Sequence, residues 1–250
     1  MMKMKLCILV AIGFSLVFLV AAKQATYEVL PVSNGGTITG KVTFTGQAPP
    51  AKEFLITKDT KVCGTGNRQI VEVDVGDDVA LKNVVVYIEG IAQGKDWQKP
   101  EGGYLIDQKA CRFLPHLTVV PKGESVTILS SDPVLHNIHT YELIGRARRT
   151  MFNEGQPYEG FKFTKAIKPR RGNVIKLECD VHDFMHAWMF VANNPYYAVI
   201  EKTATYTIPD VPPGVYEVKA WHPVLGIKTA KVSVTAAGTA EVSFEFTDTK

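Results

Sequence analysis

Short runs in which apolar and polar residues alternate occur along most of the chain, and this pattern limits the possible folds more than any other feature. Clear examples are residues 126–129, 216–220 and 240–246. Clusters of Gly, Pro, Asn and Asp separate the runs, and no amphipathic pattern continues for more than a couple of helical turns. Brief period-2 runs between turn residues are typical of β-sandwiches and barrels. The sequence therefore predicts an all-β fold.

Composition narrows the class of protein. Hydrophobic residues make up 46% of the chain, which is enough to form real cores and excludes a disordered protein, and 250 residues leave room for one or two domains. The 28 basic residues fall to 26 without Lys3 and Lys5, against 25 acidic residues. Because a nearly neutral chain without basic blocks is a poor binder of nucleic acid, we exclude that partner.

The first 22 residues have the pattern of a signal peptide. Lys3 and Lys5 precede an uncharged apolar run from Leu6 to Val20, which is shorter than the roughly 20 residues that a membrane-spanning helix needs. We predict cleavage after Ala22; an uncleaved anchor is the alternative. No other stretch is suited to span a bilayer, so we predict a mature protein without a membrane span, exported to the periplasm or the extracellular space.

Export gives the cysteines a particular meaning. Cys7 lies inside the apolar run, which leaves Cys63, Cys111 and Cys179 in the mature chain. In an oxidising compartment two of them can pair, and the third then needs a reason to stay reduced. Ligation of a metal is one such reason, because the metal holds the sulfur as a thiolate.

Metal-ligand residue types recur at three-residue intervals in one segment. Cys179, His182 and Met185 follow a strand-like run at 174–177, and a loop that leaves a strand can turn all three toward one point. A distant His136 can complete the set. One thiolate, two imidazoles and a thioether are the ligands of a blue-copper centre. Taken singly, each residue is more often ordinary core or polar structure, but the spacing and the unpaired cysteine favour a metal.

Zinc is the competing metal, and hydrolysis is the competing chemistry. Structural zinc sites usually recruit several cysteines from paired short motifs, whereas one cysteine is free here, so copper is favoured. The sequence lacks a nucleophile elbow, a zinc-protease motif and a phosphate-binding glycine loop. Ser131, Asp132 and His136 are too few and too close in sequence to supply a positioned hydrolase triad with its oxyanion hole.

Residues 103–192 resemble the cupredoxin family, most closely the amicyanin-type members with a short C-x-x-H-x-x-M ligand loop. The matching segments are that loop, the pair His136-Asn137-Ile138-His139 after Asp132-Pro133, and the approach Phe113-x-Pro115 and Val120-x-x-Gly123-x-x-Val126. The resemblance implies a Greek-key sandwich over residues 99–192 with one type 1 copper ion. It implies His136, Cys179 and His182 as strong ligands and Met185 as the axial one.

Other residues near the motif have less direct roles. The resemblance implies that Asn137 ties the two ligand-bearing segments together. Asp183 stands where amicyanin-type loops usually have Pro, and His186 or Met189 can compete with Met185 for the axial position. Residues three apart on a strand point to opposite faces, so His139 is not expected to bind the same metal as His136. His116 and His222 are expected to be structural or solvent-facing.

A second resemblance covers the flanking residues. Segments 40–46, 83–90 and 206–216 resemble strands and turns of a carboxypeptidase regulatory-like, transthyretin-like β-sandwich. Residues 193–250 alone are few for a domain with its own core. We therefore expect a discontinuous domain of residues 36–98 and 193–248, with the cupredoxin-like segment inserted or packed beside it. A tandem arrangement of two domains is the alternative.

These features predict a secreted one-electron carrier rather than a catalyst, although a copper oxidoreductase stays possible. Its redox protein partner is expected to dock at an exposed rim formed by His182, Phe184, His186 and Trp188. The alternative function is a secreted binding or scaffold module that docks to a surface or a carbohydrate, with a copper-storing or vestigial site. With Cys179 assigned to copper, Cys63 and Cys111 are predicted to form a disulfide. Residues 146–149, rich in Arg, are predicted as a solvated loop.

Overall fold

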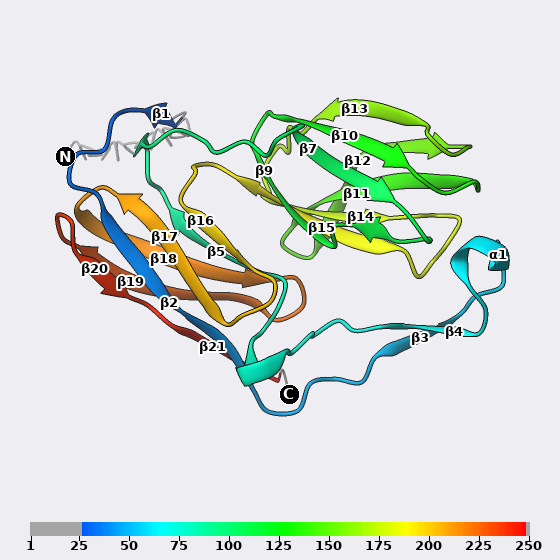
Figure 1. The fold of residues 1–250 in the computed structure, drawn as a ribbon, viewed down its shortest axis with the longest axis horizontal. Helices are drawn as coiled ribbons and strands as arrows, with labels where there is room; N and C mark the ends of the chain where they lie inside the picture. The colour runs from blue at the N-terminus through cyan, green and yellow to red at the C-terminus, as the bar shows by residue number, and fades with distance from the viewer. Residues whose placement is uncertain (1–26, 249–250) are drawn as a thin grey trace, which may run out of the picture.

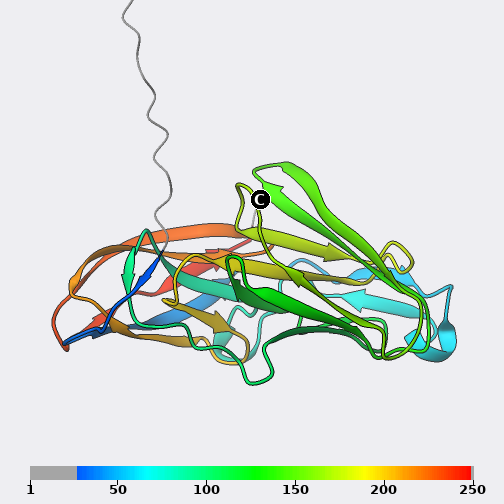
Figure 2. The same ribbon diagram turned by 90° about the horizontal axis from the view of Figure 1, so that it is seen from above.

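The computed structural model describes residues 27–248, and the predicted signal peptide lies outside them. The described chain is built almost entirely of strands, which confirms the predicted all-β class. Among these residues no helix is long and apolar enough to cross a bilayer. Figures 1 and 2 show an elongated molecule with two groups of packed sheets side by side.

The first group is a β-sandwich formed by residues 104–192, which we call the site sandwich. Both of its sheets contribute to one core, which includes Ile106, Ile128, Ile138 and Leu177. One sheet has the order β13 (Lys162–Ala166), β10 (Ser125–Ser130), β7 (Tyr104–Gln108) and β8 (Phe113–Leu114). The other has the order β12 (Ala147–Gln156), β11 (His136–Ile144), β14 (Val174–Glu178), β15 (His186–Ala192) and β9 (Leu117–Pro121).

The second group is another β-sandwich, which we call the flanking sandwich because its strands precede and follow the site sandwich in sequence. One sheet has the order β16 (Tyr197–Ile200), β5 (Val84–Glu89), β18 (Gly214–His222) and β19 (Gly226–Val234). In the other, β2 (Gly36–Thr45) pairs with β17 (Thr205–Val211), β20 (Thr239–Glu241) and β21 (Phe244–Thr247). The two sandwiches meet at a small buried cluster that includes Val119, Phe190 and Trp221.

Six short elements complete the fold. β1 (Glu28–Val29) pairs with β6 (Gln93–Gly94), and η1 (Asp77–Val79) is a single 3-10 turn. Between β2 and β5 the chain forms a hairpin of β3 (Lys52–Leu55) and β4 (Asn67–Ile70), with α1 (Thr60–Cys63) at its tip. We call residues 52–70 the cap. Although these residues fall within the range expected for the flanking domain, Ile56 and Cys63 pack into the core of the site sandwich, and Figure 1 shows the hairpin reaching the far end of that sandwich.

A disulfide fixes the tip of the cap. Cys63, the last residue of α1, is bonded to Cys111 of the site sandwich, and Cys179 is free and buried. The pairing predicted from the cysteine count is therefore confirmed. Cys63 and Cys111 are buried, with 3% and 0% of their surfaces exposed, so the bond is part of the core.

We expect the double substitution of Cys63 and Cys111 by Ser to lower the free energy of unfolding by about 4 kcal/mol. The bond closes a loop with a sequence separation of 48, and closing a loop of this length restricts the unfolded chain. Chemical denaturation of the two proteins measures the difference. Peptide mapping of the non-reduced wild type is the check, because a disulfide that contained Cys179 would contradict the pairing.

The arginine-rich segment is solvated, as the sequence predicted, but most of it is a strand rather than a loop. Only a tight turn at Gly145 and Arg146 lies outside the strands, and β12 begins at Ala147. Arg149 pairs with a buried acid on the neighbouring strand: the Glu142 side chain is 0% exposed and accepts a hydrogen bond of 3.0 Å from Nε of Arg149. The backbone N–H groups of Arg171 and Gly172 also donate to it, at 2.6 and 2.7 Å.

Glu142 is expected to make the protein acid-sensitive. Burial alone raises the pKa of Glu142, but the hydrogen bonds from Arg171, Gly172 and Arg149 outweigh burial and lower the pKa from 4.5 to about 2. Because the folded-state pKa lies below the unfolded-state pKa of 4.5, the ionised carboxylate stabilises the fold by about 3 kcal/mol at pH values above 4.5. This contribution is lost as the pH falls from 4.5 toward 2. Urea unfolding across that range is the measurement. Glu142→Gln should flatten this part of the pH dependence, and an unchanged slope would contradict the assignment.

Candidate metal centre

Two segments that carry the predicted ligands meet at one end of the site sandwich. β11 begins at His136, and the loop after β14 contains Cys179, His182 and Met185. β11 and β14 are antiparallel neighbours, with His139 opposite Glu178. The start of β11 and the end of β14 therefore lie at the same edge of the sheet. Residues that are separated by 43 to 46 positions in the sequence come into contact there.

Three of the four predicted ligands converge on one buried point. The two Nδ1 atoms of His136 and His182 are 3.2 Å apart, and Sγ of Cys179 is 3.8 Å from Nδ1 of His182. One donor atom from each of the three residues lies within 4.8 Å of the others. At most 3% of any of the three residues is exposed. Metal–nitrogen and metal–sulfur bonds of about 2.0–2.3 Å place two ligands of one ion about 3–4 Å apart, so the spacing suits a shared metal.

Carboxylates hold the far side of both imidazoles. Nε2 of His136 is 2.9 Å from Oδ2 of Asp132, and Nε2 of His182 is 2.9 Å from Oδ2 of Asp59. A carboxylate accepts a hydrogen bond from Nε2–H, which leaves the Nδ1 lone pair of each neutral ring directed at the other ring. Two facing lone pairs at 3.2 Å repel unless a cation or a proton lies between them. The donor set therefore fits a bound metal ion.

Asp132 also joins the centre to the disulfide. Its carboxylate accepts the backbone N–H groups of Ala110 and Cys111, at 2.7 and 2.8 Å, in addition to His136. On the other side, the two disulfide sulfurs and a ring nitrogen of His182 all lie within 4.8 Å of one another. The disulfide is thus packed against both imidazoles and against the Asp132 carboxylate.

Burial governs the ionisation of the site. It raises the pKa of the Cys179 thiol, against the opposing hydrogen bonds from the backbone at Asn137, His182 and Val181. It also lowers the pKa of His182, while the Asp59 carboxylate acts in the opposite direction. The metal-free site therefore favours a neutral thiol, and binding of a metal to the thiolate releases a proton.

Met185 is buried beside this cluster, and its role as axial ligand stays a prediction. It closes the loop, because its backbone C=O accepts from Cys179 N at 3.2 Å and its N–H donates to His182 O at 2.9 Å. Met189 is fully buried in the core. His186 lies instead against the ring of His116, with ring centroids 5.5 Å apart, at a cavity on the side of the sheet away from Met189.

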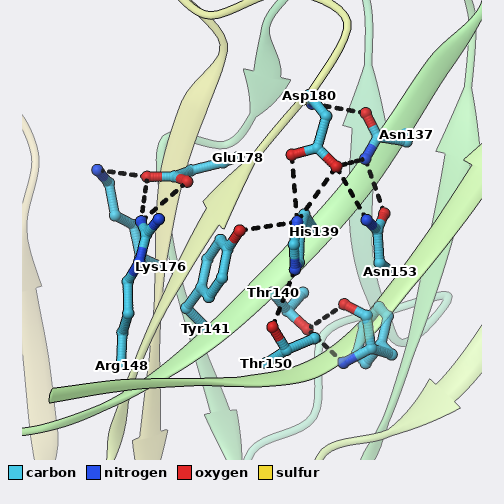
Figure 3. A network of polar contacts seen from close by, with 11 residues as sticks. Asn137, His139, Thr140, Tyr141, Arg148, Thr150, Asn153, Lys176, Glu178 and Asp180 are labelled. Carbon is cyan, nitrogen blue, oxygen red and sulfur yellow. Dashed lines mark hydrogen bonds and ion pairs between the residues drawn. The ribbon is translucent and has the colours of Figure 1, made fainter.

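His139 and Asn137 have the positions that the sequence predicts. His139 lies on the other face of β11, where Nδ1 is 2.8 Å from the Tyr141 hydroxyl and 3.1 Å from Oδ1 of Asp180 (Figure 3). Asn137 donates to Oδ2 of Asp180 at 2.9 Å and accepts from its N–H at 2.6 Å. The amide therefore ties the start of β11 to the loop that begins at Cys179.

The two remaining histidines, His116 and His222, lie outside the ligand cluster. His116 is half-buried at the cavity. His222 is fully buried and accepts hydrogen bonds from the N–H groups of Val224 and Leu225, so it is structural.

The expectation of an exposed His182 edge is wrong, because the cap covers it and only 2% of the residue is exposed. Phe184 is also buried, while the half-buried His186 and Trp188 line a cavity of about 370 Å³.

Two residues that contact the centre, Asp132 and Asp59, were not predicted as partners of the ligands. Asp132 lies four residues before His136 and belongs to the motif that resembles cupredoxins, so the short spacing held a usable signal. Asp59 is 123 positions from His182 and has no local motif. It comes to the site through the cap, and the predicted Cys63–Cys111 disulfide is the one sequence signal that connects residues 52–70 to the site sandwich.

Comparison with known proteins gives remote similarity. A purple cupredoxin from Nitrosopumilus maritimus has 22% identity, covering 36% of this chain and 99% of its own, with a TM-score of 0.31. Amicyanin from Paracoccus versutus has 15% identity, covering 37% and 84%, with a TM-score of 0.30. A copper-containing nitrite reductase from Thermus scotoductus has 10% identity, covering 60% and 28%, with a TM-score of 0.29. No protein-family model and no curated protein matches, and similarity at this level establishes no family.

Proposed function

We propose that this chain is an exported type 1 copper protein that carries single electrons between redox partners. The observation that carries the proposal is the convergence of Nδ1 of His136, Nδ1 of His182 and Sγ of Cys179 at a buried point. A soft thiolate combined with imidazoles suits both copper and zinc, and a single free cysteine favours copper over a structural zinc site. Met185 is the proposed axial ligand. Bound there, copper would supply a one-electron couple.

The protein's own residues would keep that couple reversible. Asp132 and Asp59 orient the two imidazoles, so the ligands do not have to rearrange between the two charge states. Burial of all three ligands excludes water, and the Asn137–Asp180 hydrogen bonds hold the two ligand segments together. A preorganised, closed site favours electron transfer over binding of a substrate.

The docking surface, the domain division and the export of the chain are further parts of this proposal. Since His182 and Phe184 are covered, we place the docking surface for the redox protein at the His186 and Trp188 side of the rim. The domain division at 99–192, with 36–98 and 193–248 as a transthyretin-like module, and the export of the chain are likewise proposals that rest on the sequence.

Substitution of Met185 tests the proposed axial role. Met185→Leu should keep the intense colour of the copper(II) protein and shift its reduction potential, because the axial bond is long and weak while the thiolate bond is intact. Voltammetry and visible absorption measure the two quantities. His139→Ala is the matched control, since His139 lies on the opposite face of β11, and it should change neither colour nor the ligand set.

The outcome also separates electron transfer from other roles. A reversible one-electron wave with fast self-exchange supports the carrier. An irreversible wave, or copper bound without a redox couple, would contradict it and favour the binding or scaffold module. Bleaching of the colour in Met185→Leu would show that Met185 is more than an axial ligand.

A further inference from the structure

The cap places one acidic residue between the metal centre and solvent. Oδ2 of Asp59 is 2.9 Å from Nε2 of His182, whose side chain is 1% exposed, whereas the Asp59 side chain is 35% exposed. The carboxylate is therefore the outer layer over the imidazole edge. Figure 2 shows the cap and α1 at the same end of the molecule as the strand ends of the site sandwich.

The backbone around Asp59 is built to hold that carboxylate in place. Asp59 has a positive φ of 49°, a left-handed conformation that Asp adopts more readily than most residues with a side chain. Its C=O accepts the N–H groups of Val62 and Cys63, both at 2.9 Å, which closes the turn of α1. Cys63 is in turn bonded to Cys111, so the turn that carries Asp59 is covalently joined to the site sandwich.

Arg68 anchors the returning strand of the cap to the same place. Its guanidinium donates to the backbone C=O of Cys111 at 2.7 Å and to that of Cys63, and it lies 4.8 Å from the centroid of the Phe184 ring. Phe184 belongs to the ligand loop, between His182 and Met185. The cap is thus attached to the disulfide and to the ligand loop at once, and it cannot lift from one without disturbing the other.

We propose that Asp59 is a positioning residue for His182 and that the cap it belongs to controls release of the metal. The carboxylate accepts Nε2–H, which keeps Nδ1 directed at Cys179 and His136, and it covers the outer edge of the imidazole ring. Release of the metal requires that hydrogen bond to break. This inference rests on one part of the proposed function, namely that the centre binds a metal.

Substitutions at Asp59 test the inference on the copper-loaded protein. Loss of a hydrogen-bond partner to a metal-ligating His typically weakens metal binding 10–100-fold. We therefore expect Asp59→Ala to lose copper to a strong chelator about 10–100-fold faster than the wild type. Asp59→Asn should restore most of the resistance, because its side-chain oxygen can accept the same hydrogen bond. Asp183→Asn, which removes an exposed charge beside His182, is the matched control and should release at the wild-type rate.

A spectroscopic probe separates positioning from general stability. The visible spectrum of the copper(II) protein should shift in Asp59→Ala and return close to that of the wild type in Asp59→Asn, because the oxygen at position 59 fixes the orientation of the His182 ring. Circular dichroism verifies that the variant is folded. Equal release rates for the wild type and Asp59→Ala, or an Asp59→Asn protein as fast as Asp59→Ala, would overturn the inference.

The same samples distinguish this inference from the proposed function. If the wild type holds copper but shows no reversible couple, the carrier function fails, while a faster release from Asp59→Ala still supports the cap. If the couple is reversible and the release rates are equal, only the inference about the cap fails. A wild type that binds neither copper nor Co(II) would overturn both.

Discussion

Cys179→Ser protein is expected to stay colourless with Cu(II) and to lose most of its copper affinity. The intense colour expected of the wild type arises from charge transfer between the Cys179 thiolate and Cu(II). A hydroxyl is a much poorer ligand for soft copper(I). The thiol is buried with its sulfur 3.8 Å from Nδ1 of His182, and among the described residues no other cysteine is free to supply a thiolate. Absorption spectra of the mature protein, from Lys23 onward, during titration with Cu(II) provide the measurement.

The companion variants locate the rest of the ligand set. His136→Ala should open a coordination position and change the spectrum, because it removes the nitrogen that faces His182 at 3.2 Å. One equivalent of copper should saturate the wild type. A colourless wild type would eliminate the electron carrier and leave the binding module. Colour that survives in Cys179→Ser would mean that a different set of residues binds the metal.

The strands of this protein were predictable because their signal is local. Alternation places every second side chain on one face, and a half-buried strand shows that period directly, as 126–129 does within β10. Pairing order is not local. β9 pairs in parallel with β15, so residues near Leu117 and Trp188 become neighbours only after the whole sandwich has formed. No short segment contains that information.

The metal site divides in the same way. Cys179 and His182 lie in one loop, so their spacing was enough to predict that they act together, and the structure brings His136 to them. The exposed edge of His182 was inferred from the resemblance alone. A 19-residue excursion between two strands of the flanking sandwich overturns that inference, because Asp59 and the Cys63–Cys111 bond place it over the imidazole. Contacts made across 123 positions leave no trace in local pattern.

The second large effect is expected from substitution of Asp132. This residue is 4% exposed, and its carboxylate accepts hydrogen bonds from three N–H groups. Asp132→Ala should lower the free energy of unfolding of the metal-free protein by about 5 kcal/mol, at the upper end of what removing one partner of a buried charged group causes. It leaves the N–H of Cys111 and Nε2–H of His136 buried without an acceptor. Copper binding should also weaken about 10–100-fold, since the His136 ring loses its fixed orientation.

Asp132→Asn resolves which contact matters, because an amide offers one oxygen and one NH₂ group where the carboxylate offers two oxygens. Three N–H groups converge on the side chain, so the NH₂ must face one of them, and the variant should fall between Asp132→Ala and the wild type. Urea unfolding without metal measures stability, and competition with a chelator measures affinity. Asp183→Asn, exposed and near the same loop, should change neither. If Asp132→Ala lost stability but bound copper as tightly as the wild type, the carboxylate would serve the Ala110–Cys111 turn alone, and His136 would need another group to orient it.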